Sequence, residues 1–487
     1  MRKICIVGAG VSGSILAAEL SQNTNDSITL LDCDSINNDF NYNLDLKKFF
    51  FDNYEDVKTT GYGFGGSSNL WHGVLTNLDP EDYKYIKEYV NLDLNRELNI
   101  CHKKIEKYFG QLDFKLSDIS QSHQLNSYMD LSSFLMKKYI VQKKPTRFRK
   151  LLKKQLMSKR NNLTIIENAI AIKIFKSKQN LKLIESLSYF KNGKISKLNA
   201  DIFIISLGGL ESPRILLQSF EKEPKLNKMI GEGLMDHPFS IIGNITIPKS
   251  IYYHQNGKKN LFKNNSQRIG LRLNKNFSKS GLNHSIFIRP GLNESIKEKR
   301  SALKSLIYGK FNFKVFFKII IQPYFLRTIF ELLIEKLGLG YYTKNFYVTM
   351  QFEQTIQKNS KVTLSNQSDH TSRKIPNIFQ SISNETFNDI KSTQKYLTSI
   401  LKSECKFLKF DISKNDFLPG AHYSGTCKMG TNNMNSVVDA NLQYHGINNL
   451  YICDASVLPK IGNANLTYTI AGLSIRLANH LIYNAKK

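Results

Sequence analysis

The sequence predicts an α/β protein whose parallel sheet is assembled from distant parts of the chain and interrupted by inserted segments. Three observations lead to this fold class. A strand, a glycine turn, a helix and a second strand open the chain, two more strand patterns of the buried type lie in its middle, and a strand followed by a helix closes it. With 487 residues the chain exceeds one simple core, so two interleaved domains are expected.

The N-terminal unit is a βαβ pattern. Residues 3–8, KICIVG, form an apolar run rich in β-branched side chains, residues 11–22 have helical spacing, and residues 27–32, SITLLD, form a second strand pattern. Further along, the segments 163–177 and 200–209 each predict a buried strand.

The C-terminal part returns to the same sheet. Residues 385–401 have helical spacing, residues 449–459 predict a strand and a turn, and residues 465–485 predict a helix. Strand patterns for one sheet therefore stand at both ends of the chain, with other structure inserted between them.

The composition is that of a folded globular protein, with 41% hydrophobic and 11% aromatic residues. The sequence opens directly on a strand pattern without a leader pattern, and its six cysteines form no C-x-x-C pair. These features predict a cytoplasmic protein with reduced thiols.

The formal net charge is +28. We find no nucleic-acid motif and no dense arginine patch, so no nucleic-acid partner is expected. Attraction to anionic lipid or acidic glycans stays open beside a composition rich in lysine and asparagine that is spread over solvated faces.

Residues 303–340 combine apolar and aromatic residues with regularly spaced basic ones, among them Lys310, Lys314 and Lys318. The segment is no clean transmembrane span, which needs about 20 mostly apolar residues. It predicts either a pair of amphipathic helices on the second domain or a peripheral membrane contact with snorkelling lysines.

The first glycine turn has the spacing of a dinucleotide cradle. Gly8, Gly10 and Gly13 form G-x-G-x-x-G between a strand and a helix, and Asp32 ends the next strand. Such a turn lets the backbone approach a pyrophosphate at a helix N-terminus, and the acid can accept hydrogen bonds from the adenosine ribose. The motif does not separate NAD from FAD.

Several segments resemble the glucose–methanol–choline (GMC) oxidoreductase family in the family's order. The resemblance covers nearly the whole chain but is loose over residues 85–160 and 245–345. The segments that carry it are GYGFGGSSNLWHG (61–73), SLGGLESPRILLQS (206–219), GEGLMDHP (231–238), EQTIQKNSKVTLS (353–365), HYSGTCKMG (422–430), VVDANLQYHGINNLYICDASVLP (437–459) and GNANLTYTIAGLSIRLA (462–478).

This resemblance implies FAD in a discontinuous Rossmann-like domain, and a substrate domain with an antiparallel sheet covered by helices. The FAD-binding domain is predicted over 1–80, 160–245 and 420–487, and the substrate or cap domain over 81–159 and 246–419. The resemblance places the cofactor on ten residues: Gly8, Gly10, Gly13, Asp32, Gly65, Gly66, Ser67, Ser68, Asp454 and Ala455.

Two departures from the family pattern matter. Trp71, the single tryptophan, stands where many relatives have asparagine. A subset of the family that oxidises sugars resembles this chain in having tryptophan there. Leu70 stands where some relatives attach the flavin covalently to histidine, so non-covalent FAD is expected. His72 either contacts substrate or makes a structural hydrogen bond.

The resemblance assigns the catalytic pair to His422 and Asn465. Alcohol oxidation removes a proton from oxygen and a hydride from carbon, and a histidine base suits the proton. An asparagine can donate to the developing alkoxide. A metal site is not expected, because we find no further ligand-type residue beside His422 in the sequence except Cys427.

The expected activity is FAD-dependent oxidation of an alcohol, such as a sugar, a polyol or a glycan-linked hydroxyl. The alternatives are a flavin-containing lyase of the cyanohydrin-cleaving type and a membrane-surface protein with structural FAD. The substrate and the electron acceptor (oxygen, a quinone or a cytochrome) stay open.

Overall fold

The computed structural model describes residues 1–33, 61–115, 125, 127–132, 134–156, 162–253, 265–273, 282–290, 341–354, 356–357, 359–413 and 416–484. The segment 303–340, predicted to form either amphipathic helices or a peripheral membrane contact through Lys310, Lys314 and Lys318, lies outside these residues. Among the helices described, none combines the length and the apolar character needed to cross a bilayer.

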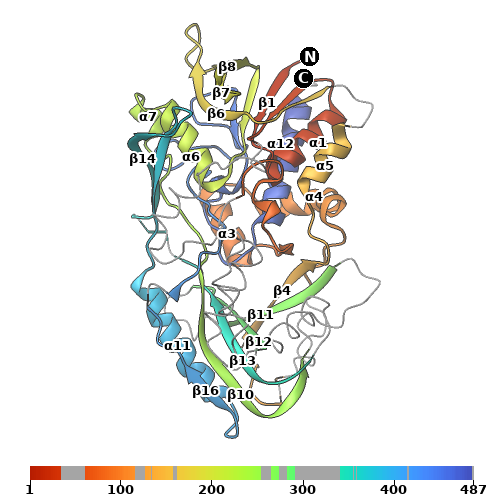
Figure 1. Ribbon diagram of the computed structural model, residues 1–487, viewed down its shortest axis with the longest axis vertical. Coiled ribbons are helices and arrows are strands. Elements are labelled where there is room, and N and C mark those ends of the chain that lie inside the picture. The colour runs from red at the N-terminus through yellow and green to blue at the C-terminus, as the bar shows by residue number, and fades with distance from the viewer. Residues whose placement is uncertain are drawn as a thin grey trace.

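A five-stranded parallel sheet lies in the upper half of the molecule, where the two chain ends lie close together (Figure 1). Its strand order is β17-β9-β1-β2-β5, and each neighbouring pair is parallel. The strands come from the beginning, the middle and the end of the chain, as predicted: β1 (Lys3–Val7), β2 (Ser27–Leu31), β5 (Leu163–Ile166), β9 (Ile202–Ile205) and β17 (Leu450–Ile452).

The prediction of one buried strand over 163–177 is wrong. The segment forms β5 in the parallel sheet and then β6 (Ile170–Lys176) in a separate sheet. Asn168 lies between them with a φ of 54°, a left-handed conformation that asparagine tolerates and that ends the strand. The separate sheet continues antiparallel through β7 (Ile184–Lys191) and β8 (Lys194–Asn199).

Helices pack beside the parallel sheet (Figure 1). The first and last helices, α1 (Val11–Asn23) and α12 (Thr467–Asn484), contact each other closely, so the two ends of the chain share one core. The remaining described helices are α3 (Pro80–Val90), α4 (Leu94–Phe109), α5 (Phe148–Leu156), α6 (Gly208–Ser219), α7 (Pro224–Asn227), α11 (Asn384–Ile400) and the 3-10 turns η1 (Gly66–Asn69) and η3 (Ala455–Val457).

A seven-stranded sheet lies in the lower half (Figure 1). Its order is β16-β10-β13-β12-β11-β4-β3, and its neighbouring strands run antiparallel. The strands are β3 (Val74–Leu75), β4 (Phe134–Gln142), β10 (Phe239–Tyr253), β11 (Asn265–Leu273), β12 (Ser285–Pro290), β13 (Tyr341–Gln351) and β16 (Lys406–Lys409). The chain crosses between the two large sheets several times, and the predicted domain bounds stay a prediction.

The two faces of the seven-stranded sheet differ. One face packs into a core that includes Ile286, Val348 and Met350 and that α11 completes through Ile390 and Leu397. Alternation along a strand turns the neighbouring side chains to the other face. That face carries polar groups such as Ser285 and Gln351, which pair across β12 and β13. The helix predicted over 385–401 is confirmed as α11.

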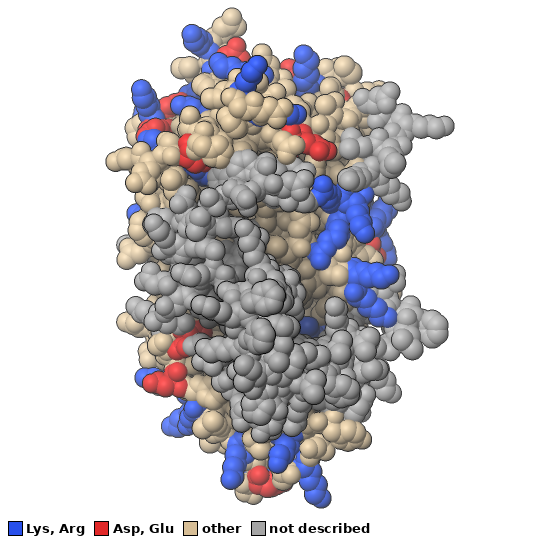
Figure 2. Space-filling view, in the orientation of Figure 1, with Lys and Arg blue, Asp and Glu red and all other residues tan. Residues whose placement is uncertain are grey.

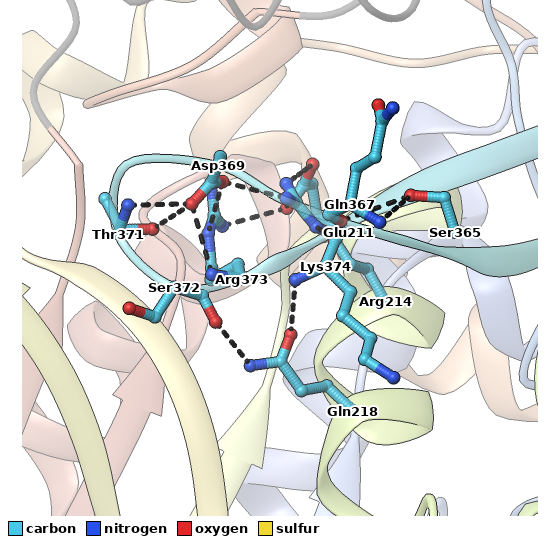
Figure 3. Close-up of polar contacts among 10 residues, drawn as sticks. All are labelled: Glu211, Arg214, Gln218, Ser365, Gln367, Asp369, Thr371, Ser372, Arg373 and Lys374. Carbon is cyan, nitrogen blue, oxygen red and sulfur yellow. Dashed lines mark hydrogen bonds and ion pairs between the residues drawn. The ribbon is translucent and has the colours of Figure 1, made fainter.

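A buried ion cluster fastens helix α6 to the turn between β14 (Lys361–Ser368) and β15 (Lys374–Phe379) (Figure 3). The Arg214 side chain is 3% exposed and lies 2.8 Å from Asp369 and 3.2 Å from Glu211. Arg373 reaches the other oxygen of Glu211 at 3.1 Å. Because these charges pair while largely desolvated, losing one partner would leave a buried charge uncompensated. Helix α6 and the hairpin are therefore held as one unit.

On the face shown in Figure 2, the described basic side chains lie in several separate places. On the face in Figure 2, Lys and Arg lie at the top, the right edge and the bottom, with acidic side chains scattered among them. This distribution agrees with a solvated basic surface, which was one of the two interpretations of the charge.

Candidate functional site

The first glycine turn has free space beside Gly10 among the described residues, whereas the space beside Gly13 is filled by the protein itself. Gly8 follows β1 with a φ of 100°, and its amide donates to Leu31 O at 2.8 Å. A Cβ on Gly13 would lie 1.8 Å from the carbonyl oxygen of Gly8, so glycine alone lets α1 approach the strand this closely. A Cβ on Gly10 would meet no described heavy atom within 4 Å. Among the described residues, open space therefore adjoins the start of α1.

A second glycine turn packs against the first. The amide of Gly65 donates to Ala9 O at 2.8 Å, and a Cβ on Gly66 would lie 3.1 Å from the Cα of Gly10. The structure thus brings together two turns that are separated by more than fifty residues in the sequence, as the resemblance implies. Backbones meet here without side chains between them, which is the geometry that lets a pyrophosphate lie along both turns.

The two serines of the second turn have different surroundings. The hydroxyl of Ser68 is buried and donates to Gly65 O at 2.6 Å, so it holds the 3-10 turn η1. The hydroxyl of Ser67 accepts from the Gly61 amide at 3.2 Å, and this residue is exposed. Contact of either serine with a cofactor stays a prediction.

Two acids stand at the carboxyl ends of parallel strands. Asp32 follows β2 and accepts from the amide of Ala9, so its carboxylate turns toward the first glycine turn. Asp454 follows β17 and accepts from the Gly208 amide at 2.9 Å and from the Ser212 hydroxyl at 2.6 Å, which fixes the start of α6. Strands β1, β2, β9 and β17 therefore all end at one rim, where open parallel sheets bind ligands.

This rim fits a dinucleotide cofactor. Open space beside Gly10, adjacent glycine turns and a helix N-terminus supply the backbone amides and the dipole that favour a pyrophosphate. Ala455 is 8% exposed and lies next to Asp454 at the far end of the rim. Its predicted contact with a flavin stays a prediction, as does the contact of Asp32 with a ribose.

The residues that depart from the family pattern lie near this rim. Trp71 donates from its indole nitrogen to Thr146 O at 3.1 Å and packs edge-on against Phe109, so it has a structural role whatever else it contacts. Leu70 caps the C-terminal end of η1. His72 is exposed.

The predicted catalytic pair meets in the structure, although 43 residues separate its members. Nδ2 of Asn465 lies 3.2 Å from Nε2 of His422. If the amide donates, Nε2 carries the lone pair and the proton stands on Nδ1. Nδ1 is buried and makes no hydrogen bond of regular geometry with the described residues. The accepting nitrogen of His422 therefore faces the carboxamide of Asn465.

Asp236 fixes the backbone that carries His422. One of its carboxylate oxygens accepts from the amides of His422 at 2.9 Å and His237 at 2.8 Å. The other accepts from Gly420 at 2.9 Å and Ala421 at 3.2 Å. Ala421 has a φ of 59°, a conformation that a residue with a Cβ rarely adopts. Four charge-assisted bonds to one carboxylate offset this strain.

His237 lies under the ring of His422. The two rings stack with centroids 4.4 Å apart and an angle of 23° between their planes. Burial lowers the pKa of His237 from 6.5 to about 4. Burial, and then the neighbouring His237, lower the pKa of His422 to about 3, against the opposing effect of Asp236. Both imidazoles are therefore neutral at neutral pH, and only a neutral imidazole can accept a proton.

Side chains that could bind a metal lie near His422 in space, although they are far from it in the sequence. Potential ligand atoms of Asp236, His237 and His422 lie within 4.8 Å of one another. Both oxygens of Asp236 and both ring nitrogens of His237 are already hydrogen-bonded. A metal ion would have to displace those bonds, so the cluster is built as a hydrogen-bonded support for His422.

The sequence reasoning missed Asp236 and His237 as parts of this site. They lie in the segment GEGLMDHP, 186 and 185 residues before His422, and nothing in the local pattern connects them to it. An adjacent acid and histidine between apolar residues and a proline was the available signal.

Comparison with known proteins agrees with this architecture. A family model described as GMC oxidoreductase matches residues 357–474. The pyridoxine 4-oxidase of Microbacterium luteolum is 58% identical over 40 residues, which is 8% of this chain and 8% of that protein. The oxygen-dependent choline dehydrogenase of Citrobacter koseri is 41% identical over 58 residues, which is 12% of this chain and 10% of that protein. The aligned segments thus span about a tenth or less of these two relatives.

Solved structures share the fold over the full length of the chain. The crystal structure of pyridoxine 4-oxidase from Mesorbium loti has a TM-score of 0.64 and 14% identity, and the match covers 99% of each chain. The formate oxidase of Aspergillus oryzae has a TM-score of 0.59 and 14% identity, and the match covers 100% of this chain and 98% of that one. The chain thus shares the fold of these solved structures, and its segment 357–474 matches the GMC oxidoreductase family model.

Proposed function

We propose that this protein is an FAD-dependent oxidoreductase that oxidises a CH–OH group of an alcohol to a carbonyl. The observation that carries the proposal is the pair formed by Nε2 of His422 and Nδ2 of Asn465, 3.2 Å apart. Rossmann-like strands and adjacent glycine turns that fit a dinucleotide support it further.

The protein's own contribution is to hold the alcohol and take its proton. FAD, when bound, supplies the hydride acceptor. A hydroxyl bound beside His422 and Asn465 would take the place of the hydrogen bond between them. It would give its proton to Nε2 of the imidazole, and the amide of Asn465 would donate to the oxygen as negative charge develops there. The C–H bond gives up a hydride and the C–O bond becomes a carbonyl, so the charges balance.

The low pKa of His422 sets the expected pH dependence of this step. A base works only when deprotonated, so activity is present above its pKa and is lost as pH falls through it. Because burial and His237 lower this pKa from 6.5 to about 3, the acid limb of kcat/KM should lie below pH 6.5.

A screen of alcohols tests the function. FAD-loaded protein is mixed with sugars, polyols, glycans, pyridoxine and choline, with a dye acceptor and with or without oxygen; the last two compounds are included because relatives are named for them. We expect one class of alcohol to reduce the dye. Product formation without dye or flavin reduction would favour a lyase, and inertness toward all alcohols would favour a structural flavin.

We also propose that the FAD is bound non-covalently. Leucine offers no nucleophile at position 70, and the residue serves as the cap of η1. Acid precipitation of the holoprotein should release the flavin into solution, which absorbance of the supernatant measures. Flavin that stays with the pellet would contradict the proposal, a relevant outcome because FAD modification has been examined in the similar formate oxidase.

The electron acceptor stays open. The cytoplasmic location and the contact of residues 303–340 with a membrane are proposals that rest on the sequence alone. On the face in Figure 2 the described basic side chains are dispersed, which supports attraction to an anionic partner no more than it supports a solvated face.

A further inference from the structure

His237 contacts His422 directly and contacts the backbone of the residue that precedes Asn465. Its ring stacks on the ring of His422, and its Nε2 lies 2.9 Å from the carbonyl oxygen of Ala464, the residue before Asn465. The chain segments that carry the two side chains are thus joined through one fully buried imidazole. This contact is independent of the hydrogen bond between His422 and Asn465.

The hydrogen bonds of His237 define one neutral tautomer. A ring nitrogen that faces a carbonyl oxygen must donate, so Nε2 carries the proton. Nδ1 then accepts from Nε2 of Gln351, the last residue of β13. The backbone oxygen of Gln351 accepts in turn from Asn463 at 2.9 Å. The seven-stranded sheet therefore braces His237, and His237 braces the segment from Asn463 to Asn465.

Neighbouring positive charges oppose protonation of the stacked rings of His237 and His422. Lys137 and any charge on His422 act against protonation, whereas the carboxylate of Asp236 favours it but is already engaged by four backbone amides. A proton on either ring would place a cation against its stacked neighbour. The pair thus holds His422 ready to accept a proton instead of already carrying one.

We propose that His237 is a positioning residue for His422. It fixes the plane of the His422 ring, keeps that ring neutral and sets its distance from Asn465. The inference rests on the proposed function for its effect on rate, but not for its effect on the His422 ring itself. An error of about 1 Å in placing a catalytic group can cost about 100-fold in rate.

The test compares His237→Gln with the matched control His284→Gln, both FAD-loaded. Glutamine keeps a hydrogen-bonding amide in place of the imidazole but removes the stacked ring. His284 is also a buried histidine with both ring nitrogens bonded, to Asp389 at 2.9 Å and to the Glu353 amide at 3.2 Å. The control therefore shows what the loss of a buried, bonded imidazole does by itself.

The first readout needs no substrate. In protein labelled with ¹⁵N in its histidine rings, the His422 signals, assigned by their loss in His422→Ala, should show a neutral ring protonated on Nδ1 in the unsubstituted protein and in His284→Gln. In His237→Gln the His422 pKa should rise toward its ordinary value, and the preference for one tautomer should weaken. An unchanged His422 ring in His237→Gln would overturn the proposal even if no alcohol is ever oxidised.

The second readout is the limiting rate of flavin reduction by an alcohol from the screen. His237→Gln should lower it by roughly 10- to 100-fold, with little change in KM, and should move the acid limb of the pH profile upward. His284→Gln should keep both. Equal losses in the two variants, or an unmoved acid limb in His237→Gln, would assign His237 a merely structural role. Failure of every alcohol with the unsubstituted protein would instead refute the proposed function.

Discussion

Replacing His422 with alanine is expected to lower the rate of flavin reduction by about 100-fold or more while FAD stays bound. The variant removes the nitrogen that faces Asn465 at 3.2 Å, so the hydroxyl proton has no acceptor at that place. The glycine turns that fit the pyrophosphate come from other segments and are unchanged. Stopped-flow measurement of flavin absorbance under saturating alcohol gives the rate.

His445→Ala is the matched control for this variant. His445 lies in the same C-terminal segment and bonds to the Ser436 hydroxyl at 2.9 Å, away from the catalytic pair. It should retain near-normal reduction. Near-normal reduction by His422→Ala, at a flavin content equal to that of the control, would remove His422 from the mechanism.

Replacing Gly10 with alanine is expected to weaken FAD binding by at least about 10-fold, or about 1.4 kcal/mol, without unfolding the apoprotein. A Cβ at this position meets no described heavy atom within 4 Å, so the fold accommodates it. The methyl group would instead occupy the space beside the helix N-terminus, where a pyrophosphate is expected. Titration of apoprotein with FAD and a thermal unfolding curve measure the two effects.

Gly13→Ala provides the contrast. Its Cβ would lie 1.8 Å from Gly8 O and 2.7 Å from the Ser206 hydroxyl, so α1 must move away from the strand. We expect a loss of about 3 kcal/mol or more in folding free energy, together with loss of FAD. If Gly10→Ala binds FAD as well as the unsubstituted protein, the cofactor does not lie along this turn.

The sequence predicted the elements whose pattern is local. The N-terminal βαβ unit, α11 and α12 follow from apolar spacing, and the structure confirms them within about two residues at each end. The segment 163–177 failed because its apolar residues continue across Asn168, where a left-handed φ redirects the chain into another sheet. Apolar periodicity records burial but does not say which sheet buries a strand.

The site residues also fall into those that a local sequence pattern predicts and those that only the fold brings together. The glycine turns carry their own signature, and the resemblance placed His422 and Asn465 on segments that the fold does bring together. Asp236 and His237 contact a loop that lies about 185 residues further along the chain, so their local Asp-His-Pro pattern could not connect them to His422. Gln351 is still less predictable, because its contact with His237 depends on how the seven-stranded sheet meets the segment around Asp236.

The most direct test of the account is anaerobic mixing of the FAD-loaded protein with the alcohol identified in the screen. We expect the visible flavin absorbance to bleach with the unsubstituted protein and to stay almost unchanged over the same time with His422→Ala. Protein that is colourless and cannot be reconstituted with FAD, or a His422→Ala variant that bleaches at the unsubstituted rate, would contradict the account.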